Sequence, residues 1–191
     1  MADISLQCRC GEVRGLAREV SPDTGTRLIC YCDDCQAFAG FLREKGGPDV
    51  LNAHGGTDIF QMTPAKVEIT RGAGQLRCIR LRPKGILRFY TACCHTPVGN
   101  TLSAGVPFVG VIHSFMGEAA VRDEFLGPVR YRVMGAFAHG APDARIHRRF
   151  PLTLLWRTIS GMLFNRLRGL HKPSPFFEGD GAPVSAPEVL S

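Results

Sequence analysis

Seven of the eight cysteines in this chain fall into three short groups whose spacing suits a metal ion. The densest group is Cys30-Tyr31-Cys32-Asp33-Asp34-Cys35, which places three thiols within six residues. Cys30 and Cys32 are two residues apart, so on an extended segment their side chains share a face, and a tight turn brings Cys35 to Cys32. Zinc binds thiolates at about 2.3 Å in a tetrahedron, so this stretch could fill three corners. The fourth corner could be closed by a distant residue or left open for water or substrate.

The other two groups are Cys8-Arg9-Cys10 and Cys93-Cys94. Alternation over residues 4–10 predicts a strand with both cysteines of the first pair on one face, and Gly11 predicts a turn directly after it. The second pair follows a predicted hairpin, where a returning strand could complete the site that the first pair begins. Three ordered groups predict metal binding, and thiolate ligation favours zinc over magnesium or calcium, with an iron–sulfur cluster as the alternative.

The composition indicates a globular protein with reduced thiols. Apolar residues make up 45% of the 191 residues and charged residues 21%, which is ordinary for a globular chain. We find no apolar run near the ~20 residues that span a bilayer and no resemblance to a signal peptide, so we expect a cytoplasmic protein. In that compartment eight cysteines favour metal over disulfides. Cys78, which stands alone on a predicted strand, is expected in the core.

Short alternating segments separated by turns predict a mainly β fold. The expected strands are residues 4–10, 12–16, 26–29, 57–62, 66–70, 76–82, 86–90, 98–102, 106–115 and 129–133. The clearest hairpin joins residues 76–82 to residues 86–90 through Pro83-Lys84-Gly85. Residues 36–42 predict a helical turn or a compact loop, and residues 123–127 a short helix or turn.

Several polar residues near these motifs have two interpretations. The hairpin is basic through Arg77, Arg80, Arg82, Lys84 and Arg88, which could form a solvated face or recognise an anion. Asp33 and Asp34 are either solvated or able to accept a proton. His95 is either a loop residue or a fourth ligand or acid–base group, and His113 is expected to be a hydrogen-bonded core histidine.

The C-terminal part of the chain has a different composition. Apolar residues recur at helical spacing at Leu152, Leu155, Trp156, Ile159, Met162 and Leu163. Seven Lys and Arg residues and no acidic residue lie between positions 145 and 172. The predicted amphipathic helix could pack its apolar stripe on the β core, or it could lie on a membrane surface or a partner. We therefore divide the chain into a β domain, residues 1–140, and a basic helix with a Pro/Gly-rich tail, residues 141–191, which Phe176 and Phe177 could anchor.

The net charge of +6 is weak evidence for a nucleic-acid partner. If seven cysteines bind two zinc ions as thiolates, the thiolates add seven negative charges and the zinc ions add four positive charges, so the net charge falls to +3. We expect no nucleic-acid binding, and the sequence does not determine the oligomeric state.

The cysteine motifs resemble those of a known family. The stretches Cys8-Arg9-Cys10-Gly11, Cys30-Tyr31-Cys32-Asp33-Asp34-Cys35 and Cys94-His95-Thr96-Pro97 are similar to the glutathione-dependent formaldehyde-activating enzyme (Gfa) and centromere protein V (CENP-V) family. The likeness covers roughly residues 4–115, and the Cys-Gln-Ala-Phe-Ala stretch and Pro-Phe-Phe tail resemble a divergent bacterial branch of unknown activity. The resemblance implies a mainly β, Mss4-like zinc-binding fold, here followed by the C-terminal amphipathic helix.

The resemblance also implies two zinc ions. The family's structural zinc corresponds to Cys8, Cys10 and Cys94, and the family's other late cysteine falls on Thr91, for which Cys93 is the candidate replacement. The second zinc, regarded as catalytic in Gfa-type enzymes, corresponds to Cys30, Cys32 and Cys35. The seven expected metal ligands are thus Cys8, Cys10, Cys30, Cys32, Cys35, Cys93 and Cys94.

Two functions are compatible with these residues. The first, implied by the resemblance, is a zinc-dependent carbon–sulfur lyase acting on thiol–aldehyde adducts of the S-hydroxymethylglutathione type, with glutathione or another small thiol as co-substrate. The second is a non-catalytic, zinc-stabilised module that binds a partner through its basic C-terminal helix. Similarity of fold does not transfer activity.

Overall fold

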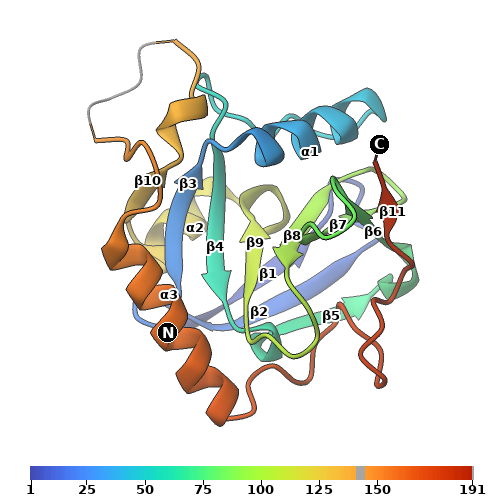
Figure 1. The fold of residues 1–191 in the computed structure, drawn as a ribbon. Coiled ribbons are helices and arrows are strands. Elements are labelled where there is room, and N and C mark those ends of the chain that lie inside the picture. Colours follow the sequence, from blue (N-terminus) through green and yellow to red (C-terminus); the bar gives the residue numbers. More distant parts are fainter. Residues whose placement is uncertain (141–144, 191) are drawn as a thin grey trace.

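Two β-sheets dominate the computed structural model, which describes residues 1–140 and 145–190 (Figure 1). The larger sheet has eight strands in the order β10-β3-β4-β9-β8-β7-β6-β11, and the smaller has three in the order β1-β2-β5. Neighbouring strands are antiparallel except at the two edges of the larger sheet, where β10 and β11 run parallel to β3 and β6. The predicted mainly β fold is confirmed.

Most predicted strands form, but β1 ends at Gln7, so the prediction that a strand carries Cys8 and Cys10 is wrong and both lie in the turn that follows. The sequence also did not predict β11. The larger sheet contains β3 (Thr26–Cys30), β4 (Thr57–Met62), β6 (Leu76–Arg80), β7 (Leu87–Thr91), β8 (Pro97–Thr101), β9 (Val109–Ile112), β10 (Tyr131–Val133) and β11 (Glu188–Val189). The smaller contains β1 (Ala2–Gln7), β2 (Arg14–Val20) and β5 (Val67–Arg71). The predicted hairpin is confirmed, with Cys78 of β6 opposite Phe89 of β7.

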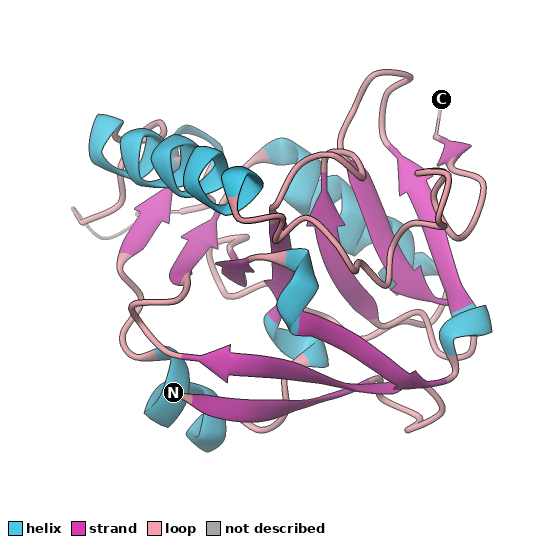
Figure 2. Cartoon of the chain, turned by 90° about the horizontal axis from the view of Figure 1, so that it is seen from below, coloured by secondary structure: helices cyan, strands magenta, loops and turns pink. Residues whose placement is uncertain are grey.

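The main core lies between the two sheets. Ile4 and Leu6 of β1 are buried in one cluster with Phe60 of β4 and Phe89 of β7. Alternation along β1 turns these apolar side chains inward and the intervening polar ones outward. Figure 2 shows the long strands of the small sheet along one side of the molecule, with the helix α3 (Leu152–Leu167) near the opposite side. Cys78 is buried in this core and belongs to neither group of clustered thiols, as predicted.

The helix α1 (Asp33–Glu44) packs against the larger sheet, where its Phe38 and Leu42 meet Tyr90 and Ile112. It extends beyond the helical turn predicted for residues 36–42. Cys32 is the N-cap of the helix, and its sulfur accepts a hydrogen bond from the Cys35 N–H. Asp33 and Asp34 in the first turn interact favourably with the positive end of the helix dipole.

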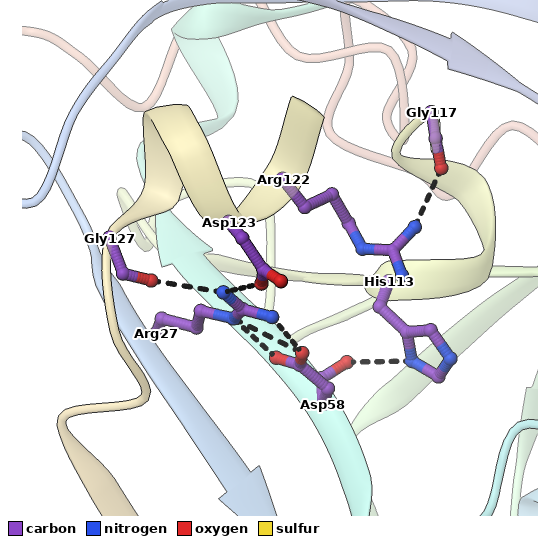
Figure 3. A network of polar contacts seen from close by, with 7 residues as sticks. All are labelled: Arg27, Asp58, His113, Gly117, Arg122, Asp123 and Gly127. Carbon is purple, nitrogen blue, oxygen red and sulfur yellow. Dashed lines mark hydrogen bonds and ion pairs between the residues drawn. The ribbon is translucent and has the colours of Figure 1, made fainter. Parts of the chain in front are cut away.

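A polar network ties the short helix α2 (Ala119–Leu126) to the edge of the larger sheet (Figure 3). The Arg27 guanidinium pairs with Asp58 at 2.8 Å and with Asp123 at 2.7 Å, and it donates to the Gly127 carbonyl. The His113 Nδ1–H donates to the Asp58 carbonyl at 3.2 Å, and burial lowers the His113 pKa. His113 is therefore the hydrogen-bonded, largely buried histidine that the sequence predicts.

The C-terminal tail contributes to the main core. Phe176 is fully buried with its ring centroid 4.9 Å from that of Phe89, and Phe177 lies 6.3 Å from the same ring. The predicted anchoring by these two residues is confirmed. The predicted domain boundary at 140/141 falls at residues 141–144, which lie outside the described residues.

The helix α3 forms as predicted, but its apolar stripe faces solvent and the opposite face packs against the rest of the protein. Leu154 is its buried residue, whereas Leu152, Trp156 and Leu163 are 82%, 75% and 64% exposed. Packing of the apolar stripe on the β core is therefore a wrong prediction. The side facing the protein carries Arg157, whose guanidinium donates to the Thr26 hydroxyl at 3.0 Å, and it borders a cavity of about 590 Å³. In residues 1–140 and 145–190 no helix has the length and apolar character to cross a bilayer.

We expect Phe176→Ala to lower the free energy of unfolding by about 3–5 kcal/mol, because it leaves a cavity beside Phe89. Chemical denaturation of the metal-loaded protein measures this change. Phe150→Ala, which removes the same ring from an exposed position, should change stability by far less. Equal effects of the two substitutions would contradict a structural role for the tail.

Candidate functional site

Cys8, Cys10, Cys93 and Cys94 form a four-thiol cluster between the end of β1 and the β7–β8 connection. Their sulfur atoms all lie within 4.8 Å of one another. The Cys8–Cys10, Cys8–Cys93, Cys10–Cys93 and Cys93–Cys94 sulfur distances are 3.5, 3.8, 3.3 and 3.9 Å. A tetrahedron with metal–sulfur bonds of 2.3 Å has edges of about 3.8 Å, so these thiols fit one divalent ion with little movement.

Two turns bring the four sulfurs together. After β1 the chain reverses at Gly11, whose φ is +76°, and the Val13 N–H donates to the Cys8 sulfur at 3.2 Å. After β7 the chain bends so that the His95 N–H donates to the Thr91 carbonyl at 2.8 Å, with His95 itself at a φ of +53°. This bend explains how adjacent cysteines both reach the cluster, and Cys93 takes the place predicted for it.

Thr91 lies beside the cluster without offering a thiolate. Its hydroxyl is 3.5 Å from the Cys94 sulfur, and the Thr96 hydroxyl is 3.2 Å from the same atom. Burial raises the pKa of Cys94, but these hydrogen bonds outweigh it and lower the pKa to about 5. Both threonines therefore stabilise Cys94 as a thiolate, which is the form that binds metal. His95 stacks on Tyr90 and is not part of the cluster, which favours the loop-residue interpretation.

Cys30, Cys32 and Cys35 form a three-thiol cluster at the junction of β3 and α1, with sulfur atoms within 4.8 Å of one another. Cys30 ends the strand, Cys32 caps the helix, and Cys35 lies in the first turn, where its N–H donates to the Cys32 sulfur at 3.3 Å. In the described part of the chain no other Cys, His, Asp or Glu ligand atom joins this group. The geometry therefore supplies three ligands from one short segment, as predicted.

The three thiols differ in acidity. Hydrogen bonds from Cys30 and Cys35 lower the pKa of Cys32 to about 3, with help from the helix N-terminus and the charge of Arg88. Hydrogen bonding to the two other cysteines, together with burial, raises the pKa of Cys30 well above its usual range. For Cys35 the bond with Cys30 lowers the pKa, but Cys32 and burial outweigh it and raise the pKa to about 12. The metal-free cluster thus holds one thiolate, at Cys32.

A buried cation lies next to this cluster. Arg88, the second residue of β7, is 1% exposed and its guanidinium lies 5.6 Å from the Phe38 ring centroid. It contacts the Asn100 amide oxygen at 3.4 Å and the Asp34 carboxylate at 3.6 Å, and its charge lowers the pKa of the neighbouring thiols. A buried charge needs compensation, and one carboxylate plus a cluster of thiolates would provide it.

A small cavity adjoins both the cluster and this cation. It has about 10 Å³ of space for the centres of water molecules, close to the room that one water needs. Its lining includes Cys35, Arg88, Asn100 and Thr57. The Thr57 hydroxyl is buried and has no hydrogen-bond partner among the described residues. The cavity therefore offers a cation, an amide and a free hydroxyl to a small polar molecule beside the thiols.

The acidic residues of the three-thiol stretch are held in ion pairs. Arg82 lies 3.2 Å from the Asp34 carboxylate and 3.8 Å from that of Asp33, and Arg88 contacts Asp34 from the buried side. The predicted basic hairpin thus turns two of its five cations toward the start of α1. Arg82 stays exposed, which agrees with the solvated-face interpretation, whereas Arg88 is buried and neither interpretation describes it.

The sequence predicts Arg88 only as one of five cations on the basic hairpin, and it does not point to Thr57 or Asn100. A signal for Arg88 was present in the sequence, because it stands between the apolar Leu87 and Phe89 in a predicted strand, and the structure buries every position of β7. A charged residue in a wholly buried strand requires a partner. No comparable signal marks Thr57 or Asn100, because threonine and asparagine are common in strands and turns.

A family model described as a family of unknown function, DUF6151, matches residues 1–188. A search of curated proteins found no match. The match spans both thiol clusters and α3.

We expect Cys93→Ser to weaken metal binding at the four-thiol cluster and to lower the bound metal below two ions per chain, because the cluster loses one of its four thiolates. Elemental analysis of purified protein measures the stoichiometry. Cys78→Ser removes a buried thiol that lies in neither cluster, so it should leave the metal content unchanged. Equal metal loss in both variants would argue against the four-thiol site.

Zinc binding to the three-thiol cluster should release about two protons at pH 7, because Cys30 and Cys35 are protonated without metal while Cys32 is not. The affinity should consequently fall about 100-fold for each pH unit below 7. A pH indicator in weak buffer measures the release, with a Cys8→Ser/Cys93→Ser protein isolating this cluster. Release of three protons would contradict the assignment of a thiolate to Cys32.

Proposed function

We propose a function for this chain, which belongs to the DUF6151 family, from the geometry of its three-thiol cluster. The protein is a zinc-dependent carbon–sulfur lyase that forms or breaks thiol–aldehyde adducts of the S-hydroxymethylglutathione type. The observation that carries this proposal is the cluster of three thiols next to a small cavity, of the size of one water, whose mainly apolar lining also includes Arg88, Asn100 and Thr57. The resemblance of the cysteine motifs to the Gfa and CENP-V family, with its Mss4-like fold, supports it.

The reaction needs no redox partner. In the direction of synthesis, the sulfur of a small thiol forms a bond to the aldehyde carbon while the carbonyl π electrons move to the oxygen. The thiol proton ends on that oxygen, and breakdown is the reverse. Zinc held by Cys30, Cys32 and Cys35 would supply stabilisation of a substrate thiolate or polarisation of a carbonyl oxygen.

Arg88 would offset the charge of the thiolates. Three thiolates around a divalent ion leave a net charge of −1, which weakens attraction for an electron-rich substrate. Arg88 places a buried positive charge on the same cavity as Cys35. With the Asn100 amide and the Thr57 hydroxyl it could also donate hydrogen bonds to an oxygen that gains negative charge.

The shape of the site favours a small aldehyde. The cavity has only about 10 Å³ for water centres, so the site favours the smallest aldehyde, formaldehyde, and a larger aldehyde would have to displace Phe38 or Val50. A thiol such as glutathione would approach from the exposed end of the hairpin. Arg82 and Lys84 are exposed there and suit its carboxylates.

The four-thiol cluster would have a structural role. Four thiolates complete the coordination of zinc and leave no position for substrate. A zinc ion there would join the end of β1 to the β7–β8 connection, which are separated by more than 80 residues. We assign the seven clustered cysteines to these two zinc ions, in a cytoplasmic protein.

One observation favours the second function, a non-catalytic zinc-stabilised module. The apolar face of α3 is exposed, and the helix lies in a segment rich in Lys and Arg. In that case both zinc ions would be structural, and α3 would be the binding surface.

A direct test compares rates with purified, zinc-loaded protein. The wild-type protein should accelerate adduct formation from formaldehyde and glutathione, and Cys32→Ser should abolish the acceleration. Arg88→Gln should lower it about 100-fold, as for loss of one preorganised donor. Cys78→Ser, whose thiol lies outside both clusters, should keep the activity. A wild-type rate equal to the uncatalysed rate would favour the binding module.

A further inference from the structure

We propose that the outward-facing side of α3 binds an anionic lipid surface, with the helix lying in the plane of the membrane interface. This outer face consists of Leu152, Leu155, Trp156, Ile159, Leu163 and Leu167. The inference does not depend on the activity of the thiol clusters, because it concerns a separate surface.

The outer face forms one continuous stripe. Apart from the adjacent Leu155 and Trp156, its residues follow each other at intervals of three or four, which places them on one side of a 16-residue helix. All six are exposed, from 39% for Leu155 to 82% for Leu152. Soluble proteins rarely expose a contiguous apolar surface of this kind unless it binds something.

The opposite side of α3 holds the helix in this orientation. Arg157 donates to the Thr26 hydroxyl and to the Pro22 and Gly25 carbonyls, and the Thr158 hydroxyl contacts the Gln61 amide oxygen. Leu154 is buried with Leu28 and Val133. The inner face thus supplies polar contacts to the edge of the large sheet, and the apolar stripe cannot turn inward without breaking them.

The charges around the stripe match an anionic partner. Exposed Arg148 and Arg149 precede the helix, and exposed Arg166, Arg168 and Lys172 lie at or beyond its end. No acidic residue occurs between positions 145 and 172. A helix with an apolar stripe, flanking cations and an aromatic side chain is suited to the headgroup–acyl boundary of anionic lipids.

The same charges disfavour a second copy of the chain as occupant. A two-fold contact between antiparallel α3 helices would place Arg148 and Arg149 of each copy near Arg166 and Arg168 of the other. Like charges facing across an interface oppose association. An RNA or DNA surface would match the charge but would leave the apolar stripe without contacts.

Trp156 provides an internal probe, because it is the one tryptophan of the chain and lies within the stripe. The zinc-loaded full-length protein is mixed with vesicles of phosphatidylcholine and phosphatidylglycerol, and separately with pure phosphatidylcholine. We expect a blue shift of Trp156 emission and co-sedimentation with the anionic vesicles. Binding should be at least about tenfold tighter than to neutral vesicles and should weaken with salt.

Two matched pairs of variants test the surface. Leu163→Glu should abolish vesicle binding, whereas Leu102→Glu, at an exposed apolar position away from α3, should not. The double variant Arg166→Glu/Arg168→Glu should weaken binding to anionic vesicles at least about tenfold, whereas Lys84→Glu should have little effect. Unchanged metal content and thermal melting of each variant would exclude misfolding as the cause.

Three outcomes would overturn the proposal. These are an unchanged Trp156 emission with anionic vesicles, equal binding to neutral and anionic vesicles, and vesicle binding that survives Leu163→Glu. A dimer that Leu163→Glu dissociates would instead assign the stripe to a second copy. None of these outcomes bears on the proposed lyase activity, which Leu163→Glu should leave unchanged.

Discussion

The structure depends on four cysteine sulfur atoms from distant segments that lie close enough together to share one metal ion. Four thiols from two turns more than 80 residues apart lie within 4.8 Å of one another, and four of their six sulfur–sulfur distances are 3.3 to 3.9 Å. As thiolates they would repel one another unless a cation lay among them. A bound ion would therefore connect the β1–β2 turn of the small sheet to the β7–β8 connection of the large sheet, and folding and metal binding would be coupled.

The two thiol clusters differ in what surrounds them. Around the four-thiol cluster the neighbours are neutral hydroxyls and backbone N–H groups, which suit a closed site with a structural role. Around the three-thiol cluster the neighbours are a buried guanidinium, an unpaired hydroxyl and a small cavity. The surroundings of the three-thiol cluster therefore offer a ligand both space and a positive charge, and we place the proposed chemistry at this cluster.

The apolar stripe of α3 shows a limit of pattern analysis. Periodicity correctly predicts an amphipathic helix, but it cannot tell whether the apolar side faces the core or solvent. The main core is already filled by the small sheet and by Phe176 of the tail, and the polar residues of α3 find partners on the sheet edge. Those contacts with other parts of the chain determine the orientation of the helix.

The sequence alone determines the seven clustered cysteines, the hairpin that carries Cys93 and Cys94 into place, and the mainly β character, because each depends on spacing or alternation within a short segment. Tertiary structure alone decides that Arg88 is buried beside Cys35, that Thr57 and Asn100 share its cavity, and that α3 turns its apolar side outward. These features depend on which strands become neighbours and on what already occupies the core. Distances between residues far apart in the chain are set by the packing of the whole molecule.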